Sequence, residues 1–74
     1  MMSEKMKLCA DMILMDAIED MANEEHISIA EARQRLVSSE AYDALYDPKT
    51  ELWQEGPDYF RFFYKQLKNN DSTL

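Results

Sequence analysis

Apolar residues recur at intervals of three and four along residues 3–24, which is the spacing of one face of an α-helix. Glycine and proline are absent from this stretch, and residues that favour helices dominate it. Ser3 stands where a helix cap is expected, because its hydroxyl can accept a hydrogen bond from a free backbone N–H. The pattern predicts a long helix from Ser3 to about Glu24. The residues on its inward side are Met6, Cys9, Ala10, Ile13, Leu14, Ala17, Ile18 and Met21.

A second apolar row lies on the opposite side of this predicted helix. Leu8, Met12 and Met15 are spaced at i, i+4 and i+7, so they fall on one line of the helix surface. Three apolar side chains on a nominal solvent face require cover, either from another element of the chain or from a second chain. We therefore expect these three residues to form an interface.

Ser28 marks the predicted start of a second helix. Ser28 and Glu31 have the S-x-x-E spacing, in which the side chain of each residue bonds the backbone N–H of the other. Residues 23–26 interrupt the apolar spacing just before this cap. We expect the second helix to run from Ile29 to Val37. Its inward-facing residues should be Ile29, Ala32 and Leu36.

Ser38 and Ser39 offer a cap for a third helix over residues 40–46. Pro48 ends that helix, because the residue before a proline is pushed out of the helical conformation. Residues 47–50 have the composition of a turn. Alternatively, the second and third helices are one helix with a weak joint at the two serines.

Six of the eight aromatic residues lie in residues 52–67. Trp53 falls in a loop or single turn that closes at Gly56, the only glycine of the chain. Pro57 suits the first position of a last helix, where its missing N–H is not needed. We expect this helix to end at about Lys68. Its central inward stripe should be Phe60, Phe63 and Leu67.

Three aromatic residues near this end lie beside the inward stripe. They are Trp53, Phe62 and Tyr64. Because tryptophan and tyrosine are enriched at the energetically important positions of interfaces, we expect any partner-facing surface on this end to involve these three residues.

The expected fold is a small all-α bundle of about four helices. No run of alternating β-branched residues is present, and the chain contains a single valine. With 74 residues, the chain forms one domain, in which we expect residues 69–74 to be a frayed polar tail. The predicted core consists of Cys9, Ile13, Ala17, Met21, Ile29, Leu36, Leu45, Trp53, Phe60, Phe63 and Leu67.

The formal net charge of −7 narrows the range of partners. It argues against binding to nucleic acid or to anionic membranes, both of which require basic surfaces, and it suits a basic protein partner.

The longest apolar run, residues 12–15, is too short for a signal peptide or a membrane span, so we expect a cytoplasmic protein. Cys9 is the only cysteine, which excludes a disulfide within one chain; we expect it to be a small buried hydrophobe.

The fifteen acidic residues are the first candidates for chemistry. Asp16, Asp20 and Glu24 share one helix side and are of the type that binds calcium or magnesium. However, the chain has no acidic, glycine-containing loop and no Glu-x-x-His pair, so a solvated acidic face is favoured. His26 is the only histidine and has no marked nucleophile to serve. We expect no catalytic residue, no bound metal and no cofactor.

Residues 28–46 have the size of a helix-turn-helix motif, which makes a DNA-binding regulator the alternative function. The second helix of such a motif enters the major groove. Here that helix carries Glu40 and Asp43, and its charge opposes contact with phosphates.

Residues 31–65 resemble a group of small all-helical bacterial proteins of unknown function that are common in gut anaerobes. The residues that carry the resemblance are Tyr42, Leu45, Tyr46, Trp53, Gly56, Pro57 and Tyr59. Some such proteins are encoded beside toxin-like genes, so the resemblance implies an antitoxin-like or adaptor role and supplies no catalytic residue. Together with the apolar row on the first helix, it leads us to expect a non-catalytic interaction domain that forms a homodimer.

Overall fold

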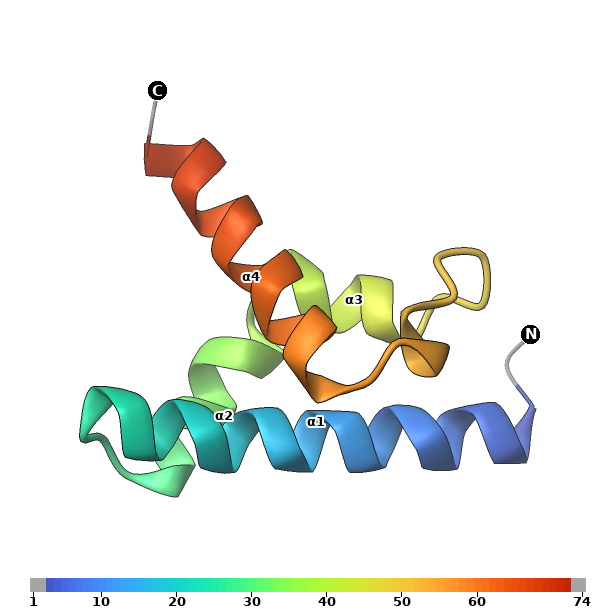
Figure 1. Cartoon of the computed structure of the whole chain (residues 1–74), viewed down its shortest axis with the longest axis horizontal. Helices are drawn as coiled ribbons and strands as arrows, with labels where there is room; N and C mark the ends of the chain where they lie inside the picture. Colours follow the sequence, from blue (N-terminus) through green and yellow to red (C-terminus); the bar gives the residue numbers. More distant parts are fainter. Residues whose placement is uncertain (1–2, 73–74) are drawn as a thin grey trace.

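Four α-helices and one short 3-10 turn follow one another along the chain (Figure 1). The computed structural model describes residues 3–72, with side chains through residue 68. Its elements are α1 (Glu4–Glu25), α2 (Ile29–Val37), α3 (Glu40–Leu45), the 3-10 turn η1 (Leu52–Gln54) and α4 (Pro57–Ser72). No strand occurs within this range, and the predicted small all-α bundle is confirmed.

Helix α1 runs along one side of the molecule, and the other helices lie together on its inner side (Figure 1). Its start is capped as predicted, because the Ser3 hydroxyl accepts a hydrogen bond from the Met6 N–H at 3.2 Å. Its end is set by His26, whose backbone is left-handed with φ 56°. The N–H groups of His26 and Ile27 both bond the Ala22 carbonyl, which satisfies an otherwise free acceptor at the helix end. The single histidine therefore terminates α1.

Helix α2 has the predicted bounds, but its cap is simpler than predicted. The Ser28 hydroxyl accepts a hydrogen bond from the Glu31 N–H at 3.0 Å. The predicted return bond from the Glu31 side chain is replaced by an ion pair with Arg35, at 3.0 Å from Nη2 to Oε2. Arg35 is four residues further on, so the pair lies along one side of the helix.

The α2–α3 joint is a break between two helices, which resolves the alternative of one continuous helix. Ser39 occupies the cap position of α3, but its hydroxyl donates backwards to the Leu36 carbonyl at 2.6 Å. After α3, residues 47–50 form the predicted turn, in which the Asp47 carboxylate accepts a hydrogen bond from the Lys49 N–H at 2.9 Å.

Gly56 and Pro57 connect η1 to α4 as the sequence predicts. Gly56 has φ 96°, a backbone conformation that other residues avoid, and Pro57 is the first residue of the helix. Helix α4 continues to Ser72 rather than ending at about Lys68, so residues 69–72 are helical instead of a tail. Residues 73–74 lie outside the described residues.

The core lies between α1 and the remaining helices. Its fully enclosed large side chains are Phe60, Met21, Leu36 and Leu45. The complete buried set is Ala10, Ile13, Ala17, Ile18, Met21, Ala22, Ala32, Leu36, Ala41, Leu45, Leu52 and Phe60. Small alanines on α1, α2 and α3 allow the helix backbones to approach one another closely. Trp53, Phe63 and Leu67, predicted as core, are partly buried and pack against this set.

Two predicted core residues are placed wrongly. Ile29 is 54% exposed although it lies on nearly the same side of α2 as Leu36, because it is the first residue of the helix and lines the open groove, whereas Leu36 lies two turns further on and is enclosed. Cys9 is partly exposed rather than buried, since it lies at the edge of the buried face of α1, next to the fully enclosed Ala10.

Candidate functional site

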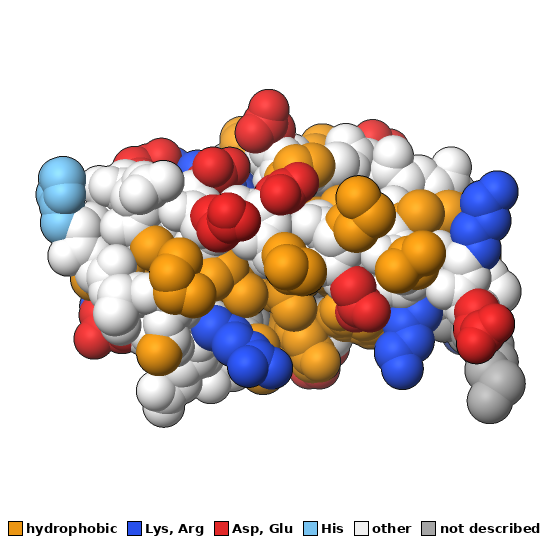
Figure 2. All heavy atoms as spheres, turned by 90° about the horizontal axis from the view of Figure 1, so that it is seen from below, with side chains coloured by type: hydrophobic (Ala, Val, Ile, Leu, Met, Phe, Trp, Pro, Cys, Tyr) orange, Lys and Arg blue, Asp and Glu red, His pale blue; other side chains and the backbone are white. Residues whose placement is uncertain are grey.

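The outer face of α1 carries the largest exposed apolar side chains of the helix. Leu8, Met12 and Met15 are 62%, 60% and 63% exposed, and they form the outer row. Helical geometry places this row opposite the buried Ala10, Ile13 and Ala17. Figure 2 shows this side of the molecule, where hydrophobic side chains extend along α1 with charged side chains beside them. The structure thus brings the three predicted residues together on one open surface.

A groove of about 760 Å³ adjoins the outer row and shares Met15 with it. It lies where one flank of α1 meets the start of α2 and the side of α3. Its apolar lining is Leu14, Met15, Ile18, Ile29, Tyr42 and Tyr46, and its polar lining is Asp11, Glu19 and Arg33. The exposed Ile29 belongs to this groove, so the outer row and the groove form one continuous apolar surface.

Tyr46 fixes the wall of the groove by joining α3 to α1. Its hydroxyl donates a hydrogen bond to the Asp11 carboxylate. Partial burial, together with this bond, raises the pKa of the Tyr46 phenol well above its ordinary value, so the phenol stays protonated and keeps donating. The Tyr42 ring packs on the Tyr46 ring, with the ring centres 4.9 Å apart. The wall of the groove formed by Tyr42 and Tyr46 is therefore held in place by its own contacts.

The charged side chains at the two ends of the outer row differ in sign. Lys5 precedes the row in the first turn of α1, and Asp16 and Glu19 follow the row in the second half of the helix. Within the part of the chain that the structure describes, none of these three residues forms an ion pair. They remain available for a partner of opposite charge.

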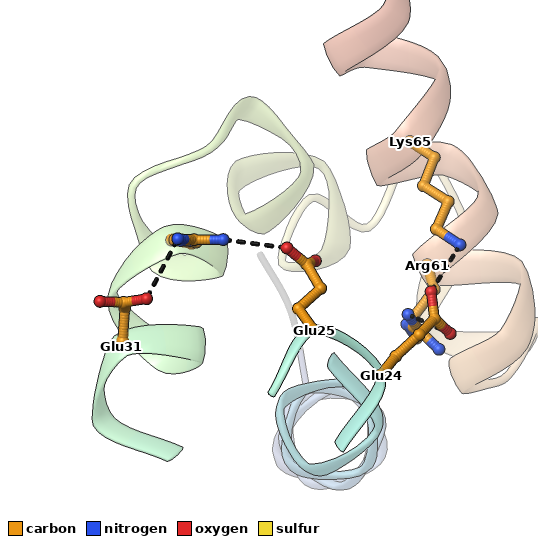
Figure 3. A network of polar contacts seen from close by, with 6 residues as sticks. Glu24, Glu25, Glu31, Arg61 and Lys65 are labelled. Carbon is orange, nitrogen blue, oxygen red and sulfur yellow. Dashed lines mark hydrogen bonds and ion pairs between the residues drawn. The ribbon is translucent and has the colours of Figure 1, made fainter. Parts of the chain in front are cut away.

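The last turn of α1 is acidic and is neutralised within the chain (Figure 3). Glu24 accepts from Arg61 at 3.0 Å and from Lys65 at 3.1 Å, which ties α1 to α4. Glu25 accepts from Arg35 of α2 at 3.0 Å. Glu24 is thereby engaged with two cations. Among the described residues, no group of three His, Cys, Asp or Glu side chains could hold a metal ion.

The Glu24 ion pairs predict a pH-dependent contribution to stability. The side chains of Lys65 and Arg61 hold the pKa of Glu24 below its ordinary value. A lowered folded-state pKa gives a stabilisation that is present above the unfolded-state pKa and is lost as the pH falls through the folded-state value. We expect Glu24→Gln to destabilise the protein at pH 7, and the difference from wild type to vanish in strong acid.

Urea unfolding of both proteins at pH 7 and pH 3 measures this difference. Glu55→Gln serves as the control, because Glu55 is an exposed carboxylate with no ion pair among the described side chains. A difference for Glu24→Gln that is as large at pH 3 as at pH 7, or larger, would show that the ion pairs with Arg61 and Lys65 are not its cause.

The three predicted aromatic interface residues differ in their exposure. Phe62 is 56% exposed on α4 and lies near Tyr59, with ring centres 6.4 Å apart. Trp53 and Tyr64 are partly buried against the core. The Trp53 ring N–H is buried and has no hydrogen-bond acceptor among the described residues. Phe62 is therefore the exposed member of this group.

Sequence reasoning found the outer row and missed the groove. The groove combines residues from three elements, and Tyr46 and Asp11, which bond across it, are 35 positions apart in sequence. The one sequence feature that pointed to the groove is the i, i+4 spacing of Tyr42 and Tyr46, because it places both rings on one side of a short helix.

Comparison with known proteins adds no relative, since no family model, curated protein or solved structure matches the chain. None of the helices in the described residues has the length and apolar character needed to cross a membrane.

Proposed function

We propose that this chain is a non-catalytic protein-interaction module that forms a homodimer through the outer face of α1. The observation that carries the proposal is the outer row. Leu8, Met12 and Met15 are each about 60% exposed, adjacent on one helix face and continuous with the groove. Contiguous apolar surface of this kind on a small soluble domain marks an interaction site more often than chance exposure.

The energetics favour a partner for this surface. Full burial of a leucine or methionine side chain contributes roughly 1.5–3 kcal/mol, so covering the outer row and Ile29 offers several kcal/mol in total. That amount is of the size needed to offset the lost translational and rotational freedom of two chains. A 74-residue domain also has a thin stability margin, which a second chain would increase.

Met12→Asp tests the proposal, because Met12 is the middle residue of the outer row. An aspartate there would be desolvated in the interface without a partner, at a cost of about 2–5 kcal/mol, so the dimer should dissociate at least about 30-fold more readily. Sedimentation equilibrium of wild type and variant measures this change. Circular dichroism should show unchanged helix content, because Met12 is 60% exposed in the single chain.

Phe62→Asp is the matched control. It introduces the same charge at a hydrophobic side chain of similar exposure, 56%, on α4. We expect its dimer affinity to stay within about threefold of wild type, since rim and off-interface charges have small effects. Dissociation of the dimer by Phe62→Asp but not by Met12→Asp would move the interface to α4.

The alternative function, a DNA-binding regulator, would use α2 and α3. Glu40 and Asp43 stand in the first turn of α3, so the end of the helix that would approach the phosphates is negative. Retention on mixed-sequence duplex at low salt, falling steeply as salt is added, would favour this alternative. Absence of retention at low salt would end it.

A further inference from the structure

We infer that two α1 helices pair in antiparallel orientation in the homodimer, centred near Met12, so that Lys5 of each copy meets Glu19 of the other. This inference rests on the proposed function and names the arrangement of the same surface. It follows from the order of charged and apolar residues along the outer face of α1.

Five residues of α1 share one narrow line of the helix. They are Lys5, Leu8, Met12, Met15 and Glu19, spaced by 3, 4, 3 and 4 positions, which is the spacing of a two-helix packing seam. The three residues in the middle of this line are the outer row, which is apolar and mostly exposed. The residues at its two ends, Lys5 and Glu19, are charged and opposite in sign. The seam is therefore bounded by one cation and one anion.

The seam is complementary to its own reversed copy. Lys5 and Glu19 each lie seven residues from Met12, about 10 Å along the axis in opposite directions at 1.5 Å per residue. Antiparallel pairing centred near Met12 therefore places Lys5 beside Glu19 of the second copy at both ends of the interface. Asp16 lies on the same flank and adds to the negative charge that Lys5 approaches. Parallel pairing would instead set Lys5 against Lys5 and Glu19 against Glu19.

The helix dipole favours the same orientation. The start of a helix carries partial positive charge and its end partial negative charge. Lys5 lies in the first turn of α1, where the partial positive charge of the helix disfavours a cation. In an antiparallel pair, the dipoles of the two helices run in opposite directions, which is more favourable than the parallel arrangement. Such charge complementarity fixes orientation more than affinity.

The two acids in the last turn of α1 are already matched inside the chain. Glu24 pairs with Arg61 and Lys65, and Glu25 pairs with Arg35. Lys5 and Glu19 have no ion-pair partner among the described side chains. A second copy supplies a partner to both at once, which a generic apolar partner would not.

Charge reversal tests the orientation by sedimentation equilibrium. Lys5→Glu and Glu19→Lys should each weaken the dimer roughly tenfold at low salt, because each creates two like-charge contacts. The double variant Lys5→Glu/Glu19→Lys should recover wild-type affinity within about threefold. Lys7→Glu is the matched control, since Lys7 changes the net charge equally but lies off the seam, and its effect should be several-fold smaller.

The outcomes separate the inference from the proposed function. A stable dimer whose affinity neither single reversal changes would contradict antiparallel pairing and leave self-association through α1 intact. Single variants that weaken the dimer without recovery in the double variant would also overturn it. A wild type that stays monomeric at high micromolar concentration would remove the proposed function itself.

Discussion

Replacing Phe60 by alanine is expected to lower the free energy of unfolding by about 3–5 kcal/mol, the range for truncating a fully buried phenylalanine. Phe60 has no exposed surface and is among the largest enclosed side chains. It lies in the first turns of α4, so its loss would leave a cavity where α4 meets the rest of the core. A domain of this size has a total stability of only about 5–10 kcal/mol, so the variant should lose most of its resistance to urea.

Urea unfolding at one fixed protein concentration measures the change, because dimer formation makes stability depend on concentration. Phe62→Ala is the control on the same helix. With 56% of its surface exposed, Phe62 should change the unfolding free energy of the chain by no more than about 0.5 kcal/mol. A loss below 1 kcal/mol for Phe60→Ala would contradict the core described here.

Phe63, which the sequence places on the same central stripe, is partly buried, so Phe63→Ala should lower the free energy of unfolding by an amount between those of Phe60→Ala and Phe62→Ala.

Leu36→Ala is expected to cost about 2–5 kcal/mol, because Leu36 is fully enclosed and anchors α2 against the core. Only two residues of α2 are buried, Leu36 and Ala32, so most of the apolar contact of this helix comes from one side chain. Thermal unfolding followed by circular dichroism measures the loss. Val37→Ala is the adjacent control, since Val37 is 37% exposed.

A second variant distinguishes packing from ion pairing in α2. Arg35 pairs with Glu25 and Glu31 on the surface, with side chains that are 38–50% exposed. Exposed ion pairs contribute roughly 0–1 kcal/mol each, so Arg35→Ala should cost much less than Leu36→Ala. Equal losses in the two variants would show that α2 is held by its charges instead.

The sequence predicts the helices well because their ends are marked by local chemistry. Ser3 and Ser28 cap α1 and α2, Gly56 and Pro57 introduce α4, and each effect acts within a few residues. The end of α4 carries no such mark. No glycine or proline follows Lys68, and the helix continues through a polar segment that composition alone suggested was a tail.

The errors in the core have a different cause. Periodicity states which residues share a side of a helix, but the packing of neighbouring helices decides which side is covered. Ile29 and Leu36 both fit an inward stripe of α2 by spacing. The way α2 lies against α1 buries Leu36 and turns Ile29 into the groove. Cys9 differs from its neighbour Ala10 for the same reason, since a rotation of one residue moves a side chain from the covered face to its edge.

The candidate site likewise has one part that the sequence predicts and one part that it does not. The outer row could be predicted because all three residues belong to one helix and their spacing alone places them together. The groove could not, because its walls come from α1, α2 and α3 and its lining depends on the tertiary contact between Tyr46 and Asp11. The groove adjoins the outer row at Met15, so the two features together extend the exposed apolar surface beyond a three-residue stripe.

The most direct test of self-association through α1 is the mass of the wild-type chain in solution. Sedimentation equilibrium at high micromolar concentration should give twice the chain mass of 8.7 kDa, with dissociation toward the single chain on dilution. A mass of 8.7 kDa at every concentration in that range would contradict the account, because the outer face of α1 would then be exposed without a second copy to cover it.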